Sequence, residues 1–282
     1  MLFHLSPKTQ SSYFYVVNPI ISSHPQQEHA LIFRDETAAL TYFYQNEERL
    51  AKDRKTWLPF RPMNANESQL VVRQRQLQVR AAECSRALDV LQLINSGEPP
   101  QNLVDPHGEH TLLELLKDRL DLSRATLIGH SFGGATALTV SATEKRFKQM
   151  VILDSWLYAL KNETSLPAAG ADIPKIFINT ETFQQPNNLK VMRPFVTSAD
   201  SCFTLKATTH EHQCDSLFLL GSWLNMGMPK LDPVLSSNLN AHVVLRFLQE
   251  RLGEPVLWTN EKFLEENSHH LVPSISLHES KL

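Results

Sequence analysis

Residues 124–138 read RATLIGHSFGGATAL, and this stretch is the strongest indication of the fold. Apolar and β-branched residues lead into the pattern G-x-S-x-G at Gly129, Ser131 and Gly133, and small or apolar residues follow at spacings that a helix can bury. The sequence therefore predicts a strand, a tight turn and a helix. In that geometry Ser131 lies on a strained turn above the carboxyl end of the strand, and side chains at Gly129 and Gly133 would collide with the neighbouring strand and helix.

Glycine is scarce in the rest of the chain, so the three glycines within residues 129–134 are a significant cluster. The 282 residues include nine glycines, and three of them lie within residues 129–134, whereas average usage would give about twenty in all. The turn could instead only pack closely or hold a phosphate. A preceding strand, a following helix and the extra glycine at Gly134 favour a nucleophile elbow, and no nucleotide-binding glycine pattern follows a strand. The N–H of Phe132 would then point to where an oxyanion forms.

A serine hydroxyl becomes a nucleophile when a histidine accepts its proton, and a carboxylate fixes the tautomer of that histidine. On this kind of turn the chain order is serine, acid and histidine, each partner following a short strand. Downstream of Ser131, the apolar run 150–153 is followed directly by Asp154, and the run 175–178 is followed three residues later by Glu181. Both carboxylates are candidates for the acid, and Asp154 is favoured because it comes directly off an all-apolar run.

Among the twelve histidines, His210 is the candidate base because it follows the strand-like run 202–207. His212 is interpreted as a structural neighbour, and His130, beside the serine, as a support of the turn. A His-x-His pair could also bind a metal ion, but no third ligand follows at a recognisable spacing, so a zinc site is not favoured.

Several segments closely resemble motifs of the platelet-activating factor acetylhydrolase family, the group VII phospholipases A2. They are Gly129-His130-Ser131-Phe132-Gly133-Gly134-Ala135-Thr136, Leu153-Asp154-Ser155-Trp156, Phe177-Ile178-Asn179-Thr180-Glu181, Trp57-Leu58-Pro59-Phe60-Arg61, Ala82-Glu83-Cys84-Ser85-Arg86-Ala87-Leu88 and Phe247-Leu248-Gln249-Glu250-Arg251-Leu252-Gly253. The resemblance runs from about residue 31 to about residue 273, and the intracellular member is the nearer one.

The resemblance assigns the nucleophile to Ser131, the acid to Asp154 and the base to His210. It implies an α/β-hydrolase fold and calcium-independent hydrolysis of short or oxidised sn-2 acyl chains from phospholipids, which gives a lysophospholipid and a short acid. No metal or organic cofactor is implied.

The N-terminal part of the family pattern is not found in this sequence. The family carries a second oxyanion donor in a Ser-His-Gly-Leu-Gly-like segment, which has no counterpart here. Two expectations follow. The chain is an active esterase whose second donor is replaced from elsewhere, for example by the unmatched N-terminus, or it is a weakly active or inactive form that acts as a lipid- or partner-binding module.

The chain is expected to contain an unmatched N-terminal segment, 1–30, an α/β-hydrolase domain, 31–273, and a polar C-terminal tail, 274–282, whose polar composition begins near residue 265. A helix is predicted over 69–96, ended by Gly97, with its arginines on a solvated face. Strands and helices then alternate to about residue 207, which predicts a mostly parallel sheet with helices on both faces.

Composition restricts the partners. With 27 basic and 30 acidic side chains the formal net charge is −3, so there is no general electrostatic attraction to nucleic acid. The sequence contains no run of eighteen apolar residues, so no transmembrane segment is predicted. The apolar stretch 217–226 is interpreted as a core helix, with peripheral membrane contact as the alternative.

Localisation is predicted from the ends of the chain. The start does not resemble a signal peptide, and Leu2 is incompatible with N-myristoylation. The final residues, Ser280-Lys281-Leu282, match a peroxisomal import tripeptide, so a cytoplasmic or peroxisomal protein is expected.

Overall fold

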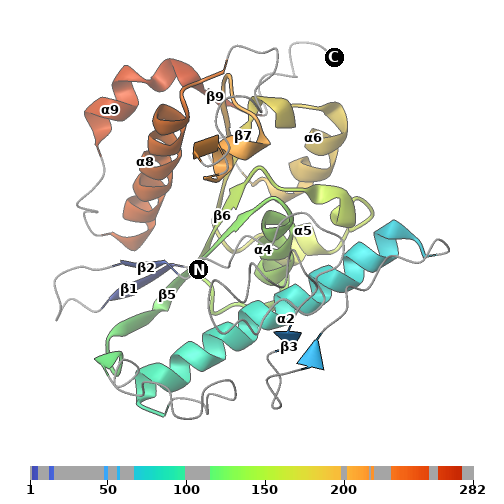
Figure 1. The fold of residues 1–282 in the computed structure, drawn as a ribbon, viewed down its shortest axis with the longest axis vertical. Coiled ribbons are helices and arrows are strands. Elements are labelled where there is room, and N and C mark those ends of the chain that lie inside the picture. The colour runs from blue at the N-terminus through green and yellow to red at the C-terminus, as the bar shows by residue number, and fades with distance from the viewer. Residues whose placement is uncertain are drawn as a thin grey trace. The chain divides into compact units, whose positions relative to one another are not determined.

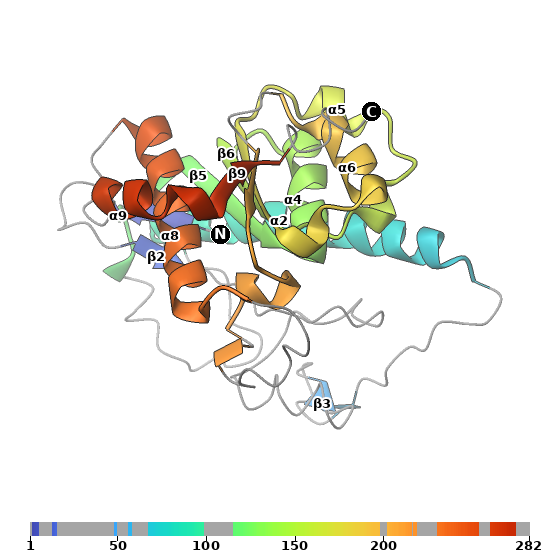
Figure 2. The same ribbon diagram turned by 90° about the horizontal axis from the view of Figure 1, so that it is seen from above.

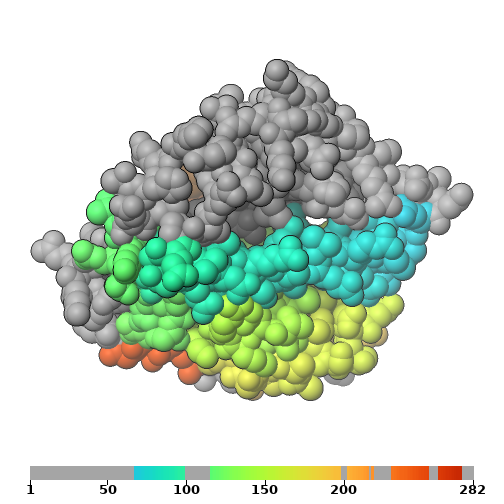
Figure 3. All heavy atoms as spheres, turned by 90° about the horizontal axis from the view of Figure 1, so that it is seen from below, coloured from blue at the N-terminus to red at the C-terminus, as the bar shows by residue number. Residues whose placement is uncertain are grey.

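The computed structural model describes residues 67–98, 115–197, 202–215, 217–218, 230–253 and 260–274, and the backbone of four short strands that precede them. These strands are β1 (Leu2–Leu5), β2 (Tyr13–Tyr15), β3 (Glu48–Arg49) and β4 (Thr56–Trp57), of which β3 and β4 pair antiparallel. The remaining residues are grey in Figure 3. Most of the apolar stretch 217–226, the motif residues 58–61 and the C-terminal tripeptide lie outside the described residues, so the predictions made for them stay predictions.

The chain divides into two compact units, Phe3–Leu122 and Ser123–Leu282, with Met1 counted in the first and Leu2 in the second. In the first unit, α2 (Gln69–Ser96) has the predicted bounds and ends where Gly97 adopts the left-handed conformation at φ 82°. The prediction of solvated arginines on this helix is wrong at Arg73, which is buried and donates from Nη1 to Gln76 Oε1 at 3.0 Å.

The second unit contains a parallel sheet, of which β5, β6 and β7 are labelled in Figure 1. The strands β5 (Leu120–His130), β6 (Gln149–Leu153), β7 (Lys175–Thr180) and β8 (Cys202–Leu205) are adjacent in this order and parallel. All six residues of β7 are buried. Burial on both faces explains why the inner strands read as continuous apolar runs rather than as alternating patterns.

Helices cover both faces of this sheet (Figures 1 and 2). The helices α4 (Phe132–Thr143), α5 (Leu166–Ala169) and α6 (Pro186–Met192) lie on one side, and α8 (Pro233–Leu252) and α9 (Glu261–Glu266) lie on the other. Short 3-10 helices connect them: η1 (Leu157–Leu160), η2 (Glu181–Phe183), η3 (Arg193–Phe195), η5 (His210–Gln213) and η7 (Ser268–His270). The predicted mostly parallel α/β fold with helices on both faces is confirmed.

The end of the described chain differs from the tail expected from residue 265 onward. After α9 and η7, β9 (Leu271–Pro273) pairs antiparallel with β8 at the edge of the sheet. Ser274 is fully buried, and its N–H donates to the Cys202 carbonyl at 3.1 Å. Three residues that end in a proline carry too short a pattern to predict a strand, and such a strand suits a sheet edge.

None of the helices in the described ranges is both long enough and apolar enough to cross a membrane.

Candidate active site

Ser131 lies on a sharp turn between β5 and α4. Its backbone has φ 57° and ψ −122°, a conformation that is unfavourable for a residue with a side chain. Three hydrogen bonds hold it. The Ser131 N–H donates to the Leu153 carbonyl at 3.0 Å, and the Ser131 carbonyl accepts from the N–H groups of Gly134 at 3.0 Å and Trp156 at 2.9 Å. The surrounding backbone thus keeps the strained turn in place.

The prediction that Gly129 and Gly133 are both required by close contacts is confirmed at Gly129 only. A Cβ on Gly129 would lie 2.1 Å from the Gly133 carbonyl oxygen, so the predicted collision at Gly129 is present. At Gly133 the prediction is wrong, because, apart from the adjacent residues and the backbone of its own helix, no atom of the described residues lies within 4 Å of a Cβ built there. The close approach at Gly129 is thus made to the Gly133 carbonyl group in the first turn of α4. The second close approach falls on Gly134, where a Cβ would lie 2.7 Å from Ser155 Cβ.

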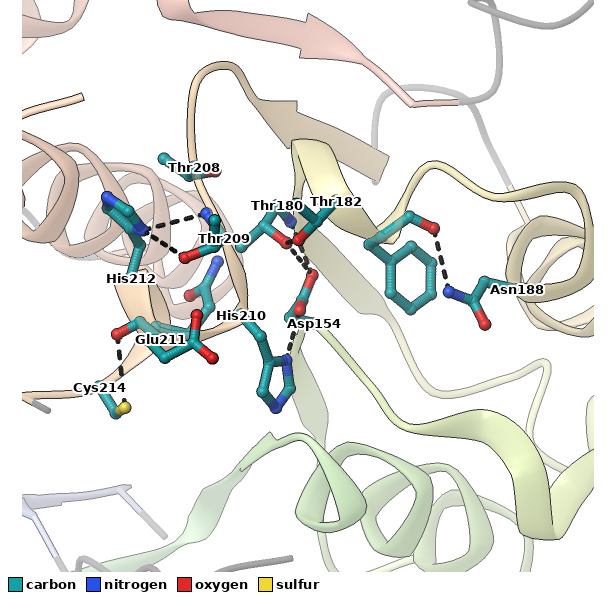
Figure 4. A network of polar contacts seen from close by, with 12 residues as sticks. Asp154, Thr180, Thr182, Asn188, Thr208, Thr209, His210, Glu211, His212 and Cys214 are labelled. Atoms are coloured by element: carbon teal, nitrogen blue, oxygen red, sulfur yellow. Dashed lines mark hydrogen bonds and ion pairs between the residues drawn. The ribbon is translucent and has the colours of Figure 1, made fainter. Parts of the chain in front are cut away.

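Asp154 follows β6 directly and is 4% exposed, with a backbone φ of 42°. Its Oδ2 lies 2.5 Å from His210 Nδ1, and its Oδ1 accepts from the Thr180 N–H at 2.7 Å and from Thr180 Oγ1 at 2.8 Å, as Figure 4 shows. Glu181, the competing acid, instead accepts from the Ala207 N–H through Oε2. The structure therefore brings Asp154, and not Glu181, to the candidate base.

Thr180 was not identified from the sequence as a site residue. It is the last residue of β7, and β7 is the parallel neighbour of β6. Parallel strands end at the same edge of a sheet, so the end of β7 had to lie near Asp154. The position of Thr180 at that strand end is the sequence signal that could have identified it.

His210 begins η5, just after β8, and its side chain is 42% exposed. Because an ionised carboxylate only accepts hydrogen bonds, His210 Nδ1 carries the hydrogen that points to Asp154, and in the neutral ring Nε2 keeps the lone pair. Burial alone lowers the pKa of His210, but the hydrogen bond and negative charge of Asp154, together with Glu211, outweigh it, so the pKa lies above its ordinary value. The ring is arranged to accept a proton at Nε2.

His212 has a structural role in the same turn. It is buried, its Nδ1 accepts from the Thr209 N–H at 3.0 Å, and its Nε2 donates to the Leu231 carbonyl at 3.2 Å. Both ring nitrogens are therefore occupied by the backbone, which leaves His212 unsuited to bind a metal ion as half of a His-x-His pair.

His130 links the serine turn to the candidate base. It is the residue before Ser131, and its ring centroid lies 4.5 Å from that of His210, with 33° between the ring planes. Burial, and next the charge of His210, lower the pKa of His130 to about 4, so its ring is neutral at pH 7. The contact brings His210 to the turn that carries Ser131, whose hydroxyl has no hydrogen-bond partner among the described residues.

Phe132 is the first residue of α4, so its N–H belongs to the helix end where backbone N–H groups point outward and carry partial positive charge. Its side chain is buried against Trp156, with ring centroids 5.7 Å apart, and Trp156 stacks on Tyr158 at the same distance. These three aromatic side chains form a continuous row of ring contacts that begins at the residue after Ser131.

A parallel α/β sheet that carries a strained serine after β5, an aspartate after β6 and, paired with that aspartate, a histidine after β8 defines the class of α/β hydrolases. Comparison with known families then gives the particular one. The family described as platelet-activating factor acetylhydrolase, isoform II, matches residues 21–268, and the chain belongs to this family.

Curated relatives named platelet-activating factor acetylhydrolase are similar over most of this chain. The relative from Bos taurus is 29% identical over 265 residues, which cover 91% of this chain and 58% of the relative. The one from Canis lupus familiaris is 30% identical over 240 residues, covering 83% and 52%. The one from Gallus gallus is 31% identical over 236 residues, covering 79% and 55%. The chain thus spans little more than half the length of these relatives.

Proposed function

We propose that the protein is a serine esterase that hydrolyses the sn-2 acetyl group, or a short or oxidised sn-2 acyl chain, of phospholipids. Membership of the family supports hydrolysis of phospholipid esters. The observation that carries the proposal is the 2.5 Å contact between Asp154 Oδ2 and His210 Nδ1. It lies beside a serine turn whose strained geometry is typical of a nucleophile elbow.

In the proposed reaction Ser131 Oγ attacks the sn-2 ester carbonyl while His210 Nε2 takes the hydroxyl proton. Asp154 keeps the imidazole in the required tautomer and stabilises the imidazolium that forms. The Phe132 N–H donates to the oxyanion of the tetrahedral intermediate. The imidazolium then protonates the leaving oxygen, and the lysophospholipid departs. A water molecule, deprotonated by His210, attacks the acyl-serine and releases the short acid. The family resemblance implies that this reaction needs no calcium ion, and none of its proposed steps uses one.

The substrate test is release of acetate from 1-alkyl-2-acetylglycerophosphocholine by the full chain, with excess chelator present throughout. A phospholipid with a long unoxidised sn-2 chain is the matched control. We expect turnover of the acetyl substrate, much weaker turnover of the long-chain substrate, and loss of both in Ser131→Ala. Acetate release that is unchanged in Ser131→Ala would refute the proposal. A folded wild-type chain that binds phospholipid vesicles without turnover would instead identify a lipid-binding module.

A further inference from the structure

Two threonine side chains extend the polar contacts of Asp154 away from His210. Thr180 reaches Asp154 Oδ1 through both its N–H, at 2.7 Å, and its hydroxyl, at 2.8 Å. Thr182 Oγ1 lies 3.1 Å from Thr180 Oγ1. Figure 4 shows the resulting row of Thr182, Thr180, Asp154 and His210. It runs from η2, past the carboxyl ends of β7 and β6, to the first residue of η5.

The direction of each hydrogen bond in this row follows from the available hydrogens. The ionised Asp154 carboxylate only accepts, so the Thr180 hydroxyl hydrogen points at Oδ1. A hydroxyl has one hydrogen, so Thr180 Oγ1 can only accept from Thr182, and Thr182 is the donor in that contact. The row is therefore directed from Thr182 to Thr180 to Asp154.

The two middle residues of the row, Thr180 and Asp154, are buried, so the loss of a hydrogen bond between them has the largest effect. Thr180 is fully buried and Asp154 is 4% exposed, whereas Thr182 is exposed and the His210 side chain is 42% exposed. Hydrogen bonds to a charged group are stronger than neutral ones, and low local dielectric strengthens them further. In such surroundings the hydroxyl of Thr180 compensates a share of the Asp154 charge that solvent cannot replace.

We propose that Thr180 and Thr182 are positioning residues that fix the orientation of the Asp154 carboxylate and limit how tightly it holds the His210 imidazolium. Thr180 acts directly on Asp154, and Thr182 acts by fixing the direction of the Thr180 hydroxyl. The inference rests on the proposed esterase function only for its kinetic consequences, because the effect on His210 can be measured without turnover.

The sign of the effect follows from charge. Without the Thr180 hydroxyl, Asp154 keeps the Thr180 N–H and the His210 contact but loses one donor, so its negative charge is less compensated. The less compensated carboxylate stabilises protonated His210 more, which moves the His210 pKa further above its ordinary value. Among the described residues, the titratable groups that face His210 are Asp154, His130 and Glu211, and the substitution removes none of them.

The experiment compares Thr180→Val, which removes the hydroxyl at nearly constant volume, with Thr180→Ser, which keeps it, and with Thr182→Val. The midpoint of His210 titration is read from its imidazole NMR signals in the full chain, and kcat and KM are measured on the acetyl substrate. We expect Thr180→Val to raise the midpoint by about half a pH unit and to lower kcat about three- to tenfold with KM within about twofold. Thr180→Ser returns both to wild-type values. Thr182→Val shifts the midpoint in the same direction by less.

A His210 midpoint in Thr180→Val equal to that of wild type would overturn the inference, whatever happens to kcat. So would equal losses in the valine and serine variants together with a lower melting temperature, because that result describes a merely structural residue. If wild type does not hydrolyse the acetyl substrate, the proposed function fails, and the NMR midpoints still decide the inference.

Discussion

The serine turn should tolerate a methyl group at Gly133 and not at Gly129. A Cβ on Gly129 would lie 2.1 Å from the Gly133 carbonyl oxygen, whereas real Cβ atoms essentially never come closer than 3.0 Å. The first turn of α4 would have to move by the difference, about 0.9 Å, together with Ser131. Overpacking of this kind typically costs about 1–3 kcal/mol, and a rigid backbone contact places Gly129→Ala near the upper end. For a chain of this size that corresponds to a fall of about 6–12 °C in melting temperature.

Gly133→Ala is the matched control. Among the described residues, only Gly97 and Gly253 are glycines with positive φ, so Gly133 already has a backbone conformation open to alanine. Apart from the adjacent residues and the backbone of its own helix, no atom of the described residues lies within 4 Å of the new methyl group, so the substitution should raise stability by about 0.5 kcal/mol through the entropy of the unfolded chain. Thermal unfolding of both variants, followed by circular dichroism, tests the reasoning. Equal melting temperatures for the two variants, or a lower one for Gly133→Ala, would refute it.

Three further predictions concern the charged and titratable groups. Asp154→Asn should lower kcat about 10³–10⁴-fold because the His210 tautomer is no longer fixed, whereas Glu181→Gln should change it less than about twofold; comparable losses in steady-state kinetics would speak against the assignment of the acid. Activity should fall as pH drops through the pKa of His210, which lies above its ordinary value of 6.5, and a pH–rate profile with its acid midpoint well below 6.5 would contradict this. The folded-state pKa of His130 is about 4 against an ordinary 6.5, so the unfolded state binds more protons between these values, and His130 should lower the free energy of unfolding by about 2 kcal/mol at pH 5 relative to pH 7. Urea unfolding of wild type and His130→Phe at both pH values measures this contribution, and a difference between the two proteins that does not change with pH would exclude it.

Local patterns were sufficient to predict the elements that position the site. The apolar runs before Asp154 and His210 are strands, and Gly97 ends α2 at the predicted residue. Each of these features depends on a few consecutive residues. A strand that is buried on both faces is a continuous apolar run, and a glycine ends a helix because it adopts the left-handed conformation easily.

Features that depend on how separate segments meet could not be predicted in the same way. Spacing left Asp154 and Glu181 as competing acids, because both follow strand ends, and the choice depends on which side chain turns toward η5. The role of Thr180 and the open space at Gly133 depend on the packing of β7 beside β6 and of α4 over β5. These contacts form between segments that are far apart in the sequence, so no pattern within one segment predicts them.

The most direct test of the central claim is to identify by mass spectrometry the residue that an organophosphorus ester reagent modifies in the folded chain. Such a reagent reacts with a serine whose hydroxyl proton is taken by a neighbouring base during the attack, so the site of modification reports the activated nucleophile. We expect one covalent adduct on Ser131, formed in wild type and lost in His210→Ala. A folded chain that stays unmodified, or an adduct on another residue, would contradict it.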